Sequence, residues 1–221
     1  MKIEPEELCD GVTLYEGDCL EVLPHLTGID AVVTDPPYGI AASKKGAHSS
    51  IRDNTRWEAK TWDDSRTVEA VRLAVSAGKY AMVWGGNYYT DVLPPSSAWF
   101  AWVKPEAETG FSLADMEMCW SNLTTAARVK HYRRRDGNLH PTQKPIEVIR
   151  WCIRQLPPGV EIILDPFAGS GTTAVAALRE GRKCILIEKD AAYCDIIRKR
   201  VRAAAGIGSL FDPSLLGDND G

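Results

Sequence analysis

The stretch "VEIILDPFAGSGTTAVAALREGRKCILIEKD" at residues 160–190 decides the fold. It predicts an apolar strand, a tight glycine turn, a helix and a second strand, over about the ~30 residues usual for a βαβ unit. Short β-branched runs alternate with helical patterns along the rest of the chain as well. We therefore expect an α/β fold with a doubly wound, mostly parallel sheet.

The other elements follow from hydrophobic periodicity. Strands are predicted at 11–18, 29–35, 79–86, 99–104 and 116–122, and helices at 19–26, 65–78, 144–156 and 191–205. Gly78 suits the C-cap of its helix. We expect one domain over residues 1–221, in which 41–66 form a long mobile loop, 123–138 a basic segment and 206–221 a flexible tail.

Composition narrows the class of protein. With 44% hydrophobic and 25% charged residues, the chain is typical of a globular domain. No apolar run approaches the ~18 residues of a membrane helix, and the acidic N-terminus has no signal-peptide core, so a cytoplasmic protein is expected. The six cysteines are scattered without zinc spacing, which predicts reduced thiols and no metal. Because the net charge is -4, a nucleic-acid partner would need a local basic patch.

The glycine turn predicts a cofactor site. The first strand of the unit ends at Asp165, the chain turns at Gly169 and Gly171, and a helix begins near Thr172. Backbone N–H groups and the helix dipole then favour an anionic or carboxylate-bearing cofactor. Residues 169–174 fit G-x-G-x-x-A, Glu188 ends the next strand where it could reach ribose hydroxyls, and no lysine follows the turn as in a P-loop. The alternatives are an NAD site and a turn that binds nothing.

A second motif lies at the end of the strand in "IDAVVTDPPYGI", residues 29–40. Pro36 and Pro37 form a stiff corner that holds Asp35 and the Pro36 carbonyl as two neighbouring acceptors. Two acceptors suit an NH₂ group, and Tyr38 offers a face on which a planar ring can stack. The corner therefore predicts a pocket for an amino-bearing base, although a β-turn with a capping Asp and a packed Tyr has the same residues.

Together the two motifs strongly resemble those of the amino-group DNA methyltransferases that use S-adenosylmethionine. Because D-P-P-Y precedes the cofactor turn, the chain resembles the permuted beta class, with a circularly permuted Rossmann-like methyltransferase fold. "HPTQKPIEVIRWCI" (140–153) and "WGGNYYTDVLPP" (84–95) are similar to family segments, the latter to small phage-type members. The resemblance implies methylation of adenine N6 in double-stranded DNA, with cytosine N4 as the alternative, in a restriction–modification or phage setting.

The resemblance also implies roles for individual residues. Glu188 would bind the ribose of S-adenosylmethionine, Asp18 would lie near its adenine, and Thr142 and Lys144 would bind its carboxylate. S-adenosylhomocysteine would be the product. The methionine end would be lined by Asp165, Pro166, Phe167, Gly169, Ser170 and Gly171. The catalytic corner, which would receive a flipped base, would comprise Asp35, Pro36, Pro37 and Tyr38.

DNA contact is expected from "RVKHYRRR" (128–135) and, second, from the loop at 43–57. The candidate residues are Arg128, Lys130, Arg133, Arg134, Arg135, Lys44 and Lys45. Solvated surface is the alternative for both segments. The tail "IGSLFDP" (207–213) resembles sliding-clamp peptides but lacks their glutamine. A homodimer is implied by resemblance alone.

Two other classes of function compete with the methyltransferase. An NAD-dependent oxidoreductase would leave the D-P-P-Y corner and the basic run without a role. A non-catalytic DNA-binding protein would need a groove-reading helix, which the sequence does not indicate, and would have no use for the cofactor turn.

Overall fold

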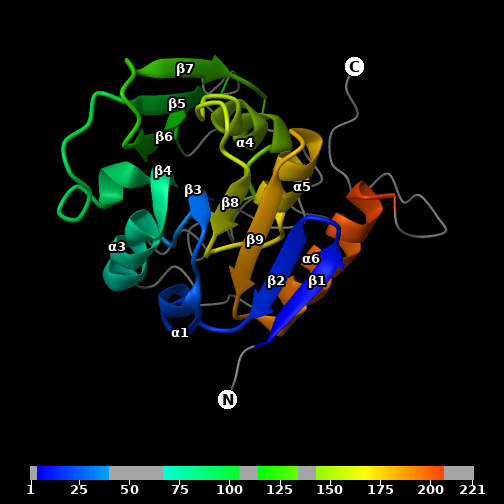
Figure 1. Ribbon diagram of the computed structural model, residues 1–221. Coiled ribbons are helices and arrows are strands. Elements are labelled where there is room, and N and C mark those ends of the chain that lie inside the picture. Colours follow the sequence, from blue (N-terminus) through cyan, green and yellow to red (C-terminus); the bar gives the residue numbers. More distant parts are fainter. Residues whose placement is uncertain (1–3, 40–66, 105–113, 134–142, 207–221) are drawn as a thin grey trace, which may run out of the picture.

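A computed structural model describes residues 4–39, 67–104, 114–133 and 143–206, and these form a nine-stranded sheet in the order β1-β2-β9-β8-β3-β4-β6-β5-β7 (Figure 1). The strands are β1 Pro5–Cys9, β2 Val12–Glu16, β3 Ile29–Thr34, β4 Gly78–Trp84, β5 Trp99–Val103, β6 Met116–Ser121, β7 Arg128–His131, β8 Ile162–Asp165 and β9 Lys183–Glu188. The central run β2-β9-β8-β3-β4 is parallel throughout. Strand β1 pairs with β2 antiparallel, as β6 does with both β4 and β5.

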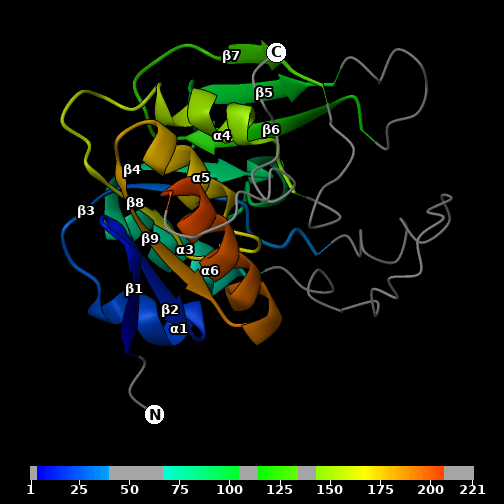
Figure 2. The same cartoon turned by 90° about the vertical axis from the view of Figure 1, so that its right-hand side faces the viewer.

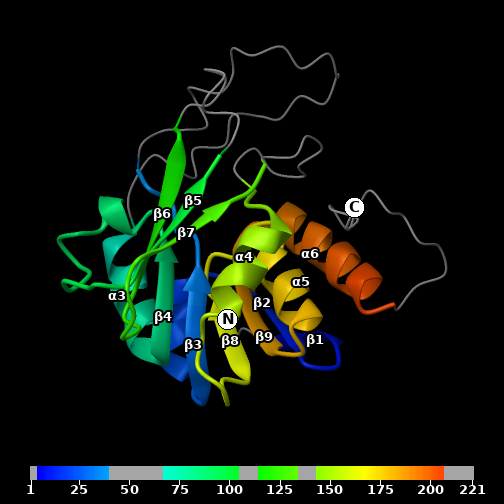
Figure 3. The ribbon, with the colours of Figure 1, turned by 90° about the horizontal axis from the view of Figure 1, so that it is seen from above.

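Helices cover both faces of this sheet. Helices α4 (Ile146–Ile153), α5 (Thr172–Arg179) and α6 (Ala191–Ala204) lie side by side on one face, which is turned toward the viewer in Figure 2. Helix α3 (Val68–Ala77) covers the other face, as the view from above in Figure 3 shows, and the short helix α1 (Cys19–Val22) packs against α3. The 3-10 turns η1 (Leu23–His25) and η3 (Gly86–Tyr88) follow α1 and β4. The doubly wound α/β fold is therefore confirmed.

Strand alternation divides the core into two clusters. Ala31 and Val33 of β3 pack with α4, α5 and α6, whereas Val32 packs with α3 on the opposite face. Both faces are apolar because successive side chains of a strand point to opposite sides and helices bury each side. The strands of the parallel run thus present their carboxyl ends, not their faces, to solvent and to ligands.

The direction of the connections reverses between β3 and β8. The chain leaves β3 for β4 on one side and leaves β8 for β9 on the other, while β3 and β8 pair with each other. A doubly wound sheet binds its ligands at such a switch point, outside the carboxyl ends of the strands. Asp35 and Asp165 stand at the ends of these two strands.

The structure adds two strands to the predicted elements. Periodicity does not predict strands β1 and β7, because Pro5–Cys9 is acidic and Arg128–His131 is basic, and neither carries an apolar alternation. Gly78 is the C-cap residue of α3, as predicted, although it does not adopt the left-handed conformation common at that position. Its φ of -120° is extended, and it begins β4 directly. The loop expected at 41–66 and the tail peptide at 207–213 lie outside the described residues.

Membrane spans and metal clusters are both absent from the described ranges. Within residues 4–39, 67–104, 114–133 and 143–206, no helix is long and apolar enough to cross a membrane. Across the same ranges, no three His, Cys, Asp or Glu side chains are grouped so that they could hold a metal ion.

Candidate active site

The two sequence motifs meet through one side-chain hydrogen bond. Thr34, the last residue of β3, donates from Oγ1 to Oδ1 of Asp165 at 2.7 Å. Asp165 also accepts from Thr173 Oγ1 at 2.6 Å and from the Phe167 backbone N–H at 3.1 Å. Burial raises the pKa of Asp165 to about 6, against the lowering effect of these donors. Asp165 thus ties β8 to β3 and to the first turn of α5.

The glycine turn leaves room on one side. Gly169 and Gly171 have φ values of 52° and 80°, in the left-handed region that favours glycine. A Cβ placed on Gly169 would meet nothing within 4 Å, whereas one on Gly171 would lie 3.2 Å from Ile197 Cγ1. The turn is therefore packed against α6 at Gly171 and open at Gly169.

Glu188 borders this open side from the end of β9. Its Oε2 accepts from the Gly169 N–H at 2.8 Å and its Oε1 from the Asp190 N–H at 2.9 Å. Burial raises the pKa of Glu188, and these backbone N–H groups oppose the rise. Each carboxylate oxygen has a second lone pair, so the same side chain can still accept from hydroxyl groups.

A buried arginine of α6, Arg200, forms hydrogen bonds with Ser170 of the glycine turn. Arg200 of α6 has no exposed surface, and its guanidinium donates to the Ser170 carbonyl at 2.6 Å and to Ser170 Oγ at 2.8 Å. Burial lowers its pKa to about 10. Ser170 Oγ in turn donates to Gln143 Oε1 at 3.0 Å. Ser170 is therefore engaged with the protein rather than turned toward the open side.

Tyrosines surround the D-P-P-Y corner. Tyr38 donates its hydroxyl to Asp35 Oδ1, and Tyr89 donates to the Pro37 carbonyl. The Tyr38 ring packs closely on Gly85, where a Cβ would come within 2.0 Å of Tyr38 Cε1. The Tyr88 ring stacks on Tyr38 with centroids 5.0 Å apart and planes at 19°. The corner is thus a rigid structure with one ring face covered by a half-exposed tyrosine.

Two consecutive residues before α4 contact the two motifs separately. Gln143 accepts from Ser170 of the glycine turn, as above, while Lys144 Nζ lies 2.5 Å from Asp35 Oδ2 and 3.0 Å from the Tyr38 hydroxyl. The resemblance predicts that Lys144 binds the cofactor carboxylate. In the structure its ammonium group is bonded to the D-P-P-Y corner, and only 4% of the side chain is exposed.

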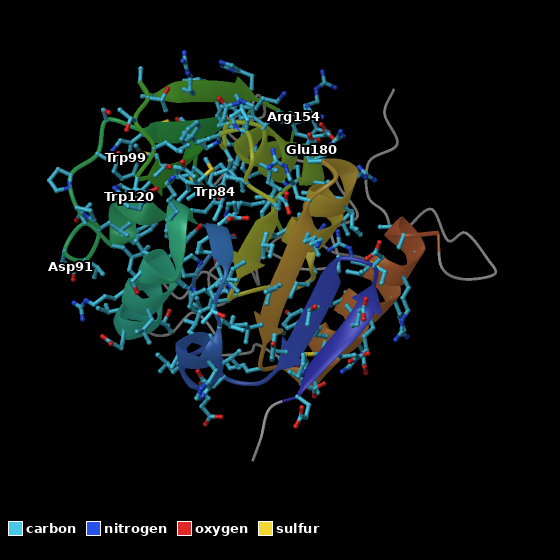
Figure 4. All side chains as sticks on the ribbon, viewed as in Figure 1. Trp84, Asp91, Trp99, Trp120, Arg154 and Glu180 are labelled. Carbon is cyan, nitrogen blue, oxygen red and sulfur yellow. The ribbon has the colours of Figure 1, made fainter. Side chains whose placement is uncertain are left out.

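Lys144 also forms an ion pair with Glu117, which forms a second ion pair with Lys104. Glu117 of β6 lies 3.1 Å from Lys144 Nζ through Oε2 and 2.7 Å from Lys104 Nζ through Oε1. Burial raises the pKa of Glu117, but the two lysines outweigh that effect and hold it at about 2. The ammonium groups of Lys104 and Lys144 lie 5.1 Å from the ring centres of Trp102 and Trp84. Figure 4 labels Trp84 beside the upper end of β4, near the tip of β3.

The remaining predicted residues are placed as follows. Asp18 is exposed, caps α1 through the Leu20 N–H at 2.9 Å, and follows Gly17, whose N–H donates to the Glu188 carbonyl. Asp18 therefore stands at the same edge as Glu188. Pro36 and Pro166 are buried and Phe167 is half-buried. Thr142, Arg134, Arg135, Lys44 and Lys45 lie outside the described residues.

The basic segment begins at an edge strand. Arg128, His131 and Arg133 are exposed and Lys130 is half-buried on β7, the last strand of the sheet. β7 is parallel to β5, and both β5 and β4 are antiparallel to β6, so β7 runs in the direction of β4. Arg133 therefore follows β7 toward the same edge of the sheet as Asp35.

Comparison with known proteins gives the family. The sequence profile of the N6/N4 DNA methylases matches residues 77–199, a range that includes the glycine turn and begins after Asp35. The type II methyltransferase M.ScaI of Streptomyces caespitosus is 28% identical over 268 aligned positions, which cover 90% of this chain and 84% of that protein.

Two solved structures have the same fold. The M1.HpyAVI–SAM complex aligns with a TM-score of 0.59 at 18% identity, over 86% of this chain and 98% of the other. The PvuII cytosine-N4-specific DNA methyltransferase aligns with a TM-score of 0.59 at 16% identity, over 98% of both chains.

The chain belongs to the N6/N4 DNA methylase family, and its relatives are type II DNA methyltransferases of the beta class. The resemblance described from the motifs is thereby confirmed, whereas these matches lend no support to a phage-type enzyme. The oxidoreductase and the non-catalytic DNA-binding protein are both set aside by this membership.

Sequence reasoning missed several residues of the site. Glu117 and Lys104 resemble ordinary strand charges, although each lies within or next to an apolar run. Arg200 resembles the other solvated basic residues of α6. Its signal is its position three residues after Ile197, on the apolar stripe that continues to Val201. The stacking of Tyr88 on Tyr38 could not be predicted, because the two residues are distant in the sequence.

Proposed function

We propose that this protein transfers a methyl group from S-adenosylmethionine to the exocyclic N6 amino group of adenine in double-stranded DNA. The observation that carries the proposal is the junction of the two motifs: the parallel pairing of β3 with β8 brings the D-P-P-Y corner and the glycine turn to one edge of the sheet, where the hydrogen bond from Thr34 to Asp165 joins them. Family membership supports the reaction class, and the leading Asp of D-P-P-Y supports the choice of adenine.

The glycine turn and Glu188 have the chemistry needed to hold the cofactor. Gly169 leaves space where any other residue would place a side chain, and Glu188 retains acceptor capacity toward ribose hydroxyls beside it. Asp18 follows Gly17, whose N–H donates to the Glu188 carbonyl, so it lies at the same edge and is assigned to the adenine side. When bound, S-adenosylmethionine supplies an electrophilic methyl group. The contribution of the protein is to orient the acceptor amine and to exclude water.

Asp35 is the group that activates the amine. The lone pair of an exocyclic amino nitrogen is shared with its ring, and hydrogen bonds from the amino hydrogens to Asp35 and to the Pro36 carbonyl favour a localised pair. The carboxylate also stabilises the positive charge that develops on nitrogen, and it can take the proton that nitrogen loses. Lys144 and Tyr38 fix both oxygens of this carboxylate, so its orientation is set before DNA arrives.

The target base must leave the duplex to reach this corner, at a cost of a few kcal/mol. Stacking on Tyr38 recovers part of that cost, but Tyr88 already covers one face of the ring. We infer that the flipped base replaces Tyr88 on Tyr38. Arg128 and Lys130 on β7, with Arg133 after it, supply contacts to the phosphates, and Arg134 and Arg135, which follow them in the sequence, add to the same basic run.

Tritium transfer tests the proposal directly. The purified protein is incubated with unmethylated DNA and methyl-tritiated S-adenosylmethionine, and the DNA is digested to nucleosides. We expect label in N6-methyladenine. Label in N4-methylcytosine would keep the mechanism and change the base, whereas unlabelled DNA with measurable cofactor binding would contradict the proposed function.

A further inference from the structure

Four charged side chains form a cluster behind the D-P-P-Y corner. Asp35, Lys144, Glu117 and Lys104 follow one another in space, with charged atoms 2.5, 3.1 and 2.7 Å apart along the series. They come from four separate segments: the ends of β3 and β5, the start of β6 and the segment before α4. We call these four residues the charge cluster.

Net stability alone does not account for the charge cluster. The side chains of Lys144 and Lys104 are 4% and 6% exposed, so both ammonium groups have lost most of their hydration. The attraction of buried ion pairs often does no more than offset that loss, and apolar side chains of similar volume are frequently as stable. Such pairs, when they lie beside a reactive carboxylate, are candidates for a functional role.

We propose that Lys144 is a positioning residue for Asp35, and that Glu117 and Lys104 hold Lys144 in place. The inference rests on the proposed function, because it gives Asp35 the task of accepting the amino hydrogens of the target base. Lys144 contacts Asp35 Oδ2 and the Tyr38 hydroxyl, which donates to the other oxygen, Oδ1. A single ammonium group therefore sets the rotation of the carboxylate and of its tyrosine partner.

Lys144 also favours the ionised form of Asp35. Burial raises the pKa of Asp35, and the ammonium of Lys144 opposes that rise. Asp35 and Glu117 together keep the pKa of Lys144 above its ordinary value, against the effect of burial. The groups that act on Asp35 electrostatically within the described ranges are Lys144, Glu117, Tyr38, Cys119 and Asp165. Of these groups, Lys144 is the cation.

Lys144→Met separates this role from binding of the cofactor carboxylate. If Lys144 positions Asp35, kcat of Lys144→Met should fall about a hundredfold, in the range found when a group that stabilises transition-state charge is removed. The acid limb of the kcat profile should move to higher pH, and Lys144→Arg should restore part of kcat. The Kd of S-adenosylhomocysteine, measured by calorimetry, should change little. A much weaker Kd with kcat and its pH profile unchanged at saturation would overturn the proposal.

The pair behind Lys144 is tested by Glu117→Gln with Lys104→Met. The double change removes one charge of each sign, so it leaves the net charge of the cluster as it was. We expect a lower kcat, with a smaller loss than in Lys144→Met, because Lys144 is no longer held in place. The acid limb should stay at lower pH than in Lys144→Met, since Glu117 itself raises the pKa of Asp35 and its removal takes that effect away. Lys79→Met is the matched control, since Lys79 is exposed and also lies over an aromatic ring, that of Tyr80. Wild-type kinetics in the double variant would refute the role of the pair.

A carboxyl titration keeps this test independent of activity. The Asp35 carboxyl carbon is followed by 13C NMR against pH in the wild type and in Lys144→Met, with thermal unfolding as the check that the variant is folded. A higher titration midpoint in the variant supports the inference, and an unchanged midpoint overturns it. If the wild-type protein methylates no DNA, the proposed function fails, while this titration still decides whether Lys144 controls Asp35.

Discussion

Thr34 and Asp165 are 131 residues apart in the chain, and a 2.7 Å hydrogen bond joins them at the point where the connections of the sheet reverse direction. The Thr34 hydroxyl stands one residue before Asp35, and the carboxylate of Asp165 stands one residue before Pro166 of the turn segment. The backbone pairing of β3 with β8 sets the distance between the two strands, and this bond joins their carboxyl ends, where the catalytic corner and the turn segment begin.

The raised pKa of Asp165 gives stability a definite pH dependence. An acid with a folded pKa of about 6 and an ordinary value of 3.8 keeps its proton in the folded protein while the unfolded chain has lost its own. Stability should therefore fall as pH rises from about 4 to about 6, by at most about 3 kcal/mol, and then level off. Denaturant unfolding at several pH values measures the free energy of unfolding of the wild type and of Asp165→Asn. The fall between pH 4 and pH 6 should be absent in Asp165→Asn, because asparagine does not titrate.

Asp30 offers a control of opposite sign for this experiment. It accepts from the N–H groups of Ile162 and Glu161, which lower its pKa. Asp30 therefore stabilises the folded protein above the ordinary carboxyl pKa, and this stabilisation is lost as pH falls through the pKa that Asp30 has in the folded protein. Asp30→Asn should therefore lose stability at neutral pH relative to acid, the reverse of Asp165→Asn. Equal pH trends in the two variants would contradict the assignment for Asp165.

Asp35→Ala should abolish methyl transfer while S-adenosylhomocysteine binds nearly as in the wild type, because Asp35 belongs to the corner and not to the glycine turn. The buried Lys144 would then keep only one of its two carboxylate partners, so we also expect the free energy of unfolding to drop by about 3 kcal/mol. Asp35→Asn keeps an acceptor oxygen and should retain more activity than Asp35→Ala. Filter-binding transfer assays and calorimetry measure both effects, and residual wild-type turnover in Asp35→Ala would remove Asp35 from the mechanism.

Gly85→Ala tests the packing of Tyr38. The added Cβ would lie 2.0 Å from Tyr38 Cε1, so the ring must shift and the hydrogen bond to Asp35 with it. Gly28→Ala is a matched control, since Gly28 has a similar φ of 74° against 65° but nothing within 4 Å of its Cβ position. Both variants carry backbone strain of about 1 kcal/mol. Only Gly85→Ala should lose kcat, and equal losses in both would mean that strain alone is responsible.

Tyr88→Ala should expose the face of Tyr38 to the target base. If the base replaces Tyr88, DNA carrying 2-aminopurine at the target position should show a larger fluorescence increase with the variant than with the wild type. Tyr88 is 38% exposed, so its removal should cost little stability. A smaller increase would mean that Tyr88 supports the flipped base instead of yielding its place.

The basic end of β7 should carry a measurable share of DNA binding. Arg128→Ala combined with Arg133→Ala should weaken affinity and reduce the slope of log K against log salt by about 0.9 for each phosphate that the variant no longer neutralises. Lys183→Ala is the control, because Lys183 is exposed at the start of β9, whose carboxyl end is the one that faces the site. An unaltered salt slope in the double variant would exclude this surface.

The sequence is informative wherever a strand ends in a distinctive motif. Asp35 and Asp165 follow clear β-branched runs, so their elements, and hence their common edge, could be predicted from periodicity and the rule for parallel sheets. The contacts of Lys144 could not be predicted, because the family segment implies a cofactor contact for this residue and gives no sign of its bond to Asp35, while its neighbour Gln143 contacts the glycine turn. Which of two neighbouring polar residues points to which motif depends on backbone direction at 143–145, and periodicity carries no information about that.

Strands β1 and β7 could not be predicted for a different reason. Each lies at an end of the sheet and pairs with a single neighbour, so neither needs the apolar run that marks a strand buried on both sides. Arg128–His131 is recognisable as a basic surface but not as a strand, since exposed edge strands commonly carry charge.

The adjacency of Gln143 and Lys144 helps to explain why the same site can form whichever of the two motifs comes first in the sequence. One peptide bond joins the residue that contacts the glycine turn to the residue that contacts the D-P-P-Y corner, so a short local segment links the two motifs on the side of α4. The order in which the ribosome makes the two motifs then has no influence on their final geometry. Circular permutation at other points of such a chain is compatible with the same site, provided that Gln143 and Lys144 remain adjacent.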